Sequence, residues 1–69
     1  MHIKLVLCNS FESDFQDKHY FIYQFVDPQT LTVLQYSTTE DLKLTNDREY
    51  DCVLSVKRSK LVVSDVLKN

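Results

Sequence analysis

The residues best suited to acid–base or nucleophilic chemistry in this 69-residue chain are two histidines, two cysteines and a run of carboxylates. Glu12, Asp14 and Asp17 precede His19, but their spacing matches no metal-binding loop, and a solvated acidic loop is the simpler interpretation. Cys8 with His19 is a conceivable nucleophile pair, yet no further group can be placed beside them. The sequence therefore predicts no catalytic residue, no metal site, no cofactor and no enzymatic activity.

The complete absence of glycine limits the chemistry further. Glycine-rich phosphate loops and dinucleotide-binding turns need a backbone that approaches phosphate closely, so both are excluded. Tight turns must use residues that tolerate a positive φ, and Asn9, Asn46 and Asp47 are the candidates.

Aromatic side chains concentrate in a predicted hairpin formed by strands 19–26 and 31–36. The segment 27–30, Asp-Pro-Gln-Thr, is typical of a type I turn, and a four-residue loop would place Val26 opposite Leu31. One face would then carry Leu34 and four aromatic residues, Phe21, Tyr23, Phe25 and Tyr36. The other face would carry aliphatic residues with some polar ones, namely Ile22, Val26, Leu31, Val33, Tyr20, Gln24 and Gln35.

Both hairpin faces are apolar, which is unusual for a sheet with one solvated side. The aromatic face has three interpretations: a platform on which nucleic-acid bases stack, the hydrophobic core, or a contact with another subunit. Tyr23 and Tyr36 suit a solvated platform best, because their hydroxyls favour contact with water.

Positive charge gathers near the C-terminus of an otherwise acidic chain. Residues 1–51 have four Lys or Arg against nine Asp or Glu, whereas residues 52–69 have Lys57, Arg58, Lys60 and Lys68 against Asp65. Lysine and arginine at the 57–60 hairpin tip can neutralise phosphates, and Lys4 would extend the patch. Ordinary solvated charge is the alternative interpretation.

The remaining pattern predicts one domain, residues 1–69, with further strands at 2–8, 49–57 and 60–67. Residues 9–18 fit a loop or one helical turn, and residues 37–41 can cap a short helix between the third and fourth strands. Cys8 and Cys52 sit in apolar runs, which predicts buried, reduced thiols. No signal sequence or membrane span is present, so we expect a cytoplasmic protein, and its small core favours a homo-oligomer.

Five strands with at most one helical turn between the third and fourth is the order of an oligonucleotide-binding (OB) barrel. Segments 44–57 and 60–66 resemble the last hairpin of small OB-fold domains. The chain is similar over residues 19–67 to small single-strand nucleic-acid-binding proteins of Gram-positive phages and mobile elements. It departs from them in having Asn46-Asp47 where glycine is common, and in its net charge of -2.

The resemblance implies an all-β, five-stranded antiparallel OB-like barrel that binds single-stranded DNA or RNA without sequence preference, in phage or mobile-element replication. Phe21, Tyr23, Phe25 and Tyr36 would stack on bases. Lys4, Lys57, Arg58 and Lys60 would contact the backbone. The alternative is a protein-interaction module that uses the same aromatic face or a sheet edge, and neither function involves a membrane or a small-molecule substrate.

Overall fold

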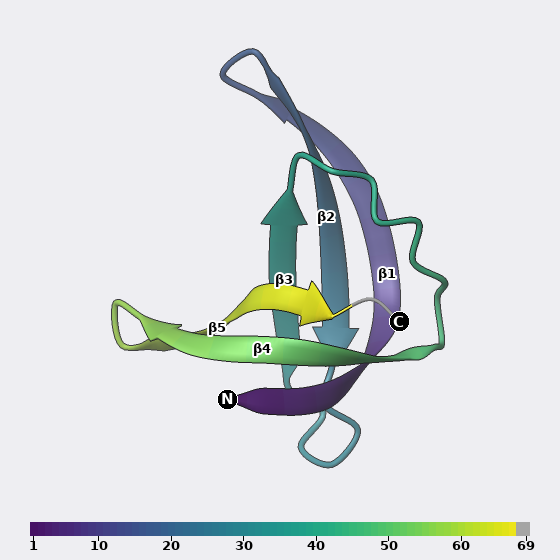
Figure 1. Cartoon of the computed structure of the whole chain (residues 1–69), viewed down its shortest axis with the longest axis vertical. Coiled ribbons are helices and arrows are strands. Elements are labelled where there is room, and N and C mark those ends of the chain that lie inside the picture. Colours follow the sequence, from purple (N-terminus) through teal and green to yellow (C-terminus); the bar gives the residue numbers. More distant parts are fainter. Residues whose placement is uncertain (68–69) are drawn as a thin grey trace.

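The computed structural model describes residues 1–67 as five antiparallel strands in one sheet, with no helix among them (Figure 1). The strands are β1 (His2–Phe15), β2 (Lys18–Val26), β3 (Val33–Thr38), β4 (Glu49–Lys57) and β5 (Lys60–Leu67), and their order in the sheet is β3-β2-β1-β4-β5. The predicted all-β antiparallel class is confirmed, and β4 and β5 have the predicted bounds. No helix of residues 1–67 has the length and hydropathy of a membrane span.

The helical turn predicted at residues 37–41 does not form. β3 continues to Thr38, so Ser37 and Thr38 belong to a strand, and Thr39 and Glu40 form a bend. The Thr38 hydroxyl accepts a hydrogen bond from the Glu40 N–H at 3.2 Å, which closes a local turn that competes with helix formation.

The sheet folds over on itself without closing into a barrel. β4 and β5 cross in front of β1, β2 and β3 in Figure 1, and the edge strands β3 and β5 approach each other. No strand pairing joins β3 to β5 within the described residues. The core lies between these two parts of the sheet, and its members are Leu5, Leu7, Tyr23, Phe25, Cys52, Leu54, Val63 and Val66.

β1 is much longer than the predicted strand 2–8. It continues through the acidic segment to Phe15, and a two-residue turn at Gln16 and Asp17 leads into β2. Both turn residues have positive φ, 48° and 63°, as a type I′ hairpin turn requires. The end of this hairpin, residues 11–22, is called the arm here; it rises above the rest of the sheet in Figure 1.

A bulge at Cys8 decides which side of β1 each side chain occupies. Leu7 lies opposite Phe25 and Asn9 lies opposite Gln24, so Cys8 is an extra residue in the ladder. Alternation therefore slips by one position. Leu5 and Leu7 face the core, whereas beyond the bulge the even-numbered residues face that side.

The β2–β3 hairpin has a six-residue loop instead of the predicted four-residue loop. Val26 pairs with Val33 and Tyr23 with Tyr36, two positions from the predicted register. A shift of two keeps every side chain on its predicted face, because side chains alternate with a period of two. The loop contains Leu31 at a φ of 60°, and Asp27 and Thr32 close it through backbone hydrogen bonds.

Tyrosine hydroxyls anchor the irregular segment 39–48 between β3 and β4. The Tyr23 hydroxyl accepts a hydrogen bond from Leu42 N–H at 2.9 Å, and the Tyr50 hydroxyl accepts one from Thr45 N–H at 2.8 Å. Among the glycine substitutes predicted from sequence, Asp47 has a positive φ, whereas Asn9 and Asn46 do not.

Candidate nucleic-acid interface

The predicted stacking residues lie on the core side of the sheet. Tyr23 is 3% exposed and Phe25 is fully buried, while Phe21 and Tyr36 are half-buried and pack against the same core. The platform interpretation is therefore wrong for Tyr23 and Phe25, which are core residues. The reason is that the β4–β5 hairpin covers the aromatic face of β2 and β3 and leaves the other face uncovered.

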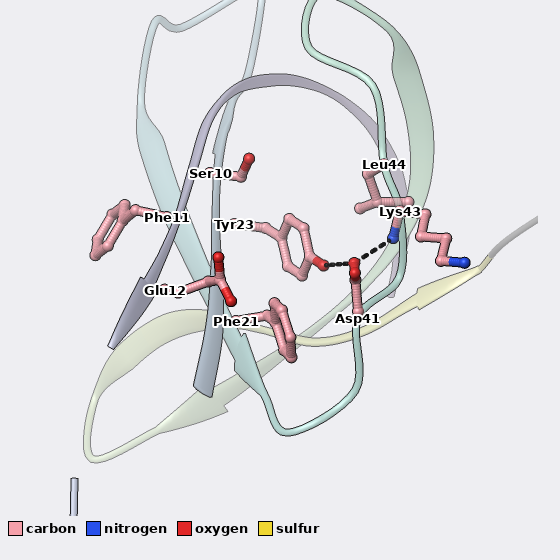
Figure 2. A pocket seen from close by; sticks show the side chains of 8 residues that line it. All are labelled: Ser10, Phe11, Glu12, Phe21, Tyr23, Asp41, Lys43 and Leu44. Carbon is pink, nitrogen blue, oxygen red and sulfur yellow. Dashed lines mark hydrogen bonds between the residues drawn. The ribbon is translucent and has the colours of Figure 1, made fainter. Parts of the chain in front are cut away.

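A small pocket of about 150 Å³ lies at the end of this core, beneath segment 39–48 (Figure 2). The Tyr23 ring points into it, and its hydroxyl donates a 3.5 Å hydrogen bond to Asp41, whose carboxylate also accepts from Lys43 N–H. Burial raises the pKa of Tyr23. Glu12 also lines the pocket, and two carboxylates make it unfavourable for an anionic ligand.

The predicted basic residues divide into two groups. Lys57, Arg58 and Lys60 are exposed at the end of the β4–β5 hairpin, where Arg58 has a φ of 51°. Lys4 does not join them, since it lies opposite Asp51, about 20 Å from Lys57 along β4. Its ammonium is 4.0 Å from the Glu49 carboxylate. Lys68 lies outside the described residues.

The uncovered side of β1, β2 and β3 carries a second aromatic group that sequence analysis did not identify. Phe11 is 44% exposed and Phe15 is 63% exposed, and half-buried Tyr20 lies between them on the neighbouring strand. Figure 2 shows Phe11 on the opposite side of β1 from Ser10 and Glu12. We call the part of this side formed by residues 11–24 and β3 the outer surface; its members are Phe11, Ser13, Phe15, Lys18, Tyr20, Ile22, Gln24, Gln35 and Ser37.

A shallow groove of about 310 Å³ runs across the outer surface. Phe15, Tyr20 and Ile22 supply its apolar walls, and Ser13 and Ser37 supply two hydroxyl groups. A serine hydroxyl both donates and accepts hydrogen bonds. The groove is therefore suited to a flat, uncharged group that carries polar atoms at its edges.

The outer surface contains no carboxylate, and the nearest ones on the same face of the sheet are those of Glu49 and Asp51 on β4, opposite Val6 and Lys4. Its one charged side chain in the arm is that of Lys18, opposite Phe15. Glu12 and Asp14 are on the core side because the bulge at Cys8 precedes them. The bulge thus separates the aromatic rings from the acidic groups of the same strand.

The acidic groups of the arm surround His19. Its Nδ1 is 2.6 Å from an Asp14 oxygen and its Nε2 is 2.6 Å from a Glu12 oxygen, and its ring stacks edge-on against Phe21 at a centroid distance of 5.1 Å. The hydrogen bonds to Glu12 and then Asp14 raise the pKa of His19. No group of three such side chains in residues 1–67 is arranged to hold a metal ion.

The two cysteines have different surroundings, and the prediction that both are buried is wrong for Cys8. Cys52 is fully buried, and burial raises its pKa to about 11. Cys8 is exposed at the bulge, where its thiol donates a 3.1 Å hydrogen bond to the Gln24 carbonyl. Both thiols are free.

The strongest candidate for a binding site is therefore the outer surface. It is aromatic, free of carboxylates in the described residues and grooved, and none of the predicted stacking residues belongs to it. Comparison with known proteins assigns no family: no family model, no curated protein and no solved structure matches the chain.

Proposed function

We propose that the chain binds single-stranded nucleic acid on its outer surface, with little base-sequence preference. The observation that carries the proposal is the exposure of Phe11 and Phe15, with half-buried Tyr20 between them, on a part of the sheet face that has no carboxylate. Aromatic rings bind any base through its π-face, and each stacked base contributes about 1–3 kcal/mol.

The spacing of the rings fits an extended strand. Phe11 and Phe15 are four residues apart on β1, about 13 Å. Tyr20 pairs with Ser13, midway between them, so each neighbouring pair of rings is about 7–8 Å apart. That is about twice the 3.4 Å spacing of one strand in a duplex. Three successive bases could therefore each stack on one ring only if they are first unstacked from one another, as in an extended single strand.

The surrounding charges support an anionic, single-stranded ligand. Lys18 lies at the end of the row of rings. The end of the β4–β5 hairpin projects beyond β3 in Figure 1, and the residues there include Lys57, Arg58 and Lys60. An OB-like domain binds oligonucleotides on its second and third strands, between the hairpins that join strands one to two and four to five. The strand order β3-β2-β1-β4-β5 and the approach of β3 to β5 support an arrangement of this kind, in which no strand pairing closes the described residues into a barrel.

The amount of exposed surface also supports a binding role. The chain exposes 5115 Å², compared with about 4,500 Å² expected for a compact 8.2 kDa monomer. A cytoplasmic location and a role in phage or mobile-element replication stay predictions from the sequence resemblance. A homo-oligomer, which would lengthen the binding surface, also stays a prediction.

Fluorescence anisotropy of a labelled poly-dT strand tests the proposal. Phe15→Ala should weaken binding by the loss of one stacked base, about 1–3 kcal/mol or roughly 5- to 150-fold. The matched control is Leu31→Ala, which truncates a 75% exposed side chain in the β2–β3 loop, away from the arm. Its affinity should equal that of the unmodified protein.

The salt dependence tests the phosphate contacts separately. Replacing Lys57, Arg58 and Lys60 with glutamine should flatten the plot of log affinity against log salt by about 0.7 per lost phosphate contact. No anisotropy change with micromolar protein at low salt would exclude the proposal. The outer surface would then be better explained as a protein-interaction site, the alternative function predicted from the sequence.

A further inference from the structure

The arm that presents the rings has little support of its own. β3 pairs with β2 only from Phe21 onwards, and β4 pairs with β1 only up to Val6. Residues 13–20 are therefore a two-stranded ribbon, and such a ribbon is marginally stable in water. Its turn also forces Gln16 and Asp17 into positive φ, which costs about 1–2 kcal/mol for each ordinary residue.

The His19 cluster, formed by His19, Glu12 and Asp14, links the two strands of this ribbon. Asp14 lies directly opposite His19, and Glu12 lies diagonally across from it. Both ring nitrogens are 2.6 Å from a carboxylate oxygen. Only the doubly protonated imidazolium can donate both hydrogen bonds, because a neutral ring has one nitrogen that only accepts.

We propose that protonation of His19 orders the arm and thereby strengthens binding at the outer surface. This inference rests on the proposed function and makes pH, acting through His19, a regulator of the same site. Phe15 and Tyr20 belong to the ribbon that the cluster links, on its opposite side. When His19 is neutral, one carboxylate loses its donor, two carboxylates remain close together, and the ribbon that holds the rings loosens.

The direction of the pH dependence follows from the charges near His19. Its pKa is raised, first by Glu12 and then by Asp14, so the folded arm holds the proton more tightly than the disordered arm. The stabilisation is complete below the ordinary histidine pKa of about 6.5, and it is lost as pH rises through the raised value. The other charged groups nearby are Asp17 and Lys18 at the turn, and Asp41 and Lys43 beside the Glu12 pocket.

The test measures poly-dT affinity between about pH 5.5 and about pH 8.5, on either side of the histidine titration. We expect the affinity to fall as pH rises, with a slope of up to about tenfold per pH unit, the limit for one proton. In His19→Gln the plot of log affinity against pH should be shallower, because the contribution of His19 is lost. His2→Gln is the matched control, since exposed His2 lies on β1 opposite β4, and it should keep the slope.

A second measurement needs no ligand and remains informative if His19→Gln disorders the arm. NMR of the free protein should give a pKa for His19 above the ordinary histidine value of about 6.5, and arm amides should lose protection from exchange as His19 deprotonates. An affinity independent of pH, or an equal slope in His19→Gln, would overturn the inference. If no oligonucleotide binds at any pH, the proposed function fails, and the amide measurement still decides whether His19 orders the arm.

Discussion

The placement of Tyr23 in the core can be tested by removing a single oxygen. In Tyr23→Phe the ring stays and the hydroxyl goes, so Leu42 N–H loses its 2.9 Å acceptor and Asp41 loses a 3.5 Å donor. An N–H left without a partner in a partly buried place costs about 1–2 kcal/mol. The whole domain is stabilised by only about 3–10 kcal/mol, so this loss is large.

Thermal unfolding followed by circular dichroism measures the effect. A loss of about 1–2 kcal/mol lowers the Tm by about 4–16 °C in a domain of this size. The matched control is Tyr20→Phe, whose hydroxyl makes no hydrogen bond within residues 1–67 and which should change the stability by less than about 0.5 kcal/mol. Equal melting temperatures for the two variants would refute the core assignment, as would weaker oligonucleotide binding by a fully stable Tyr23→Phe protein.

Two further predictions concern the thiols and the hairpin turn. At about pH 8 a thiol reagent should modify Cys8 alone in the folded protein and both cysteines in urea, because Cys52 is buried with a pKa of about 11; two rapidly reacting thiols without urea would contradict this. Replacing Gln16-Asp17 by Asn-Gly should raise the unfolding free energy by about 0.5–2 kcal/mol, because both positions have positive φ. A denaturant titration checks this, and an unchanged or lower midpoint would show that the turn is unstrained.

The last hairpin was the most predictable part of the fold. β4 and β5 are rich in valine and leucine, and only Arg58 and Ser59 separate them, so their bounds follow from the sequence. The second half of β1 was not predictable in the same way. Its serines and carboxylates have low strand propensity, and they pair because Asp14 and Glu12 meet His19 across the ribbon.

The sequence correctly places the aromatic residues of β2 and β3 on a common face. It does not show whether that face lies in the core or in solvent. Both faces of the hairpin are apolar, and the choice depends on where the β4–β5 hairpin packs. Long-range packing of this kind leaves no local pattern in the sequence. Phe11 and Phe15 were missed for a second reason, since a bulge with no glycine to mark it precedes them.

That bulge fixes which residues of β1 the interior receives. If β1 paired without it and kept every residue, Phe11 and Phe15 would turn to the interior and Glu12 and Asp14 to the exterior. A deletion of Cys8 would instead remove the extra residue itself, so regular alternation would return with Phe11 and Phe15 still on the outer surface. Related chains should therefore lose this residue and the bulge together, whereas substitutions at position 8 should be tolerated because they preserve the spacing.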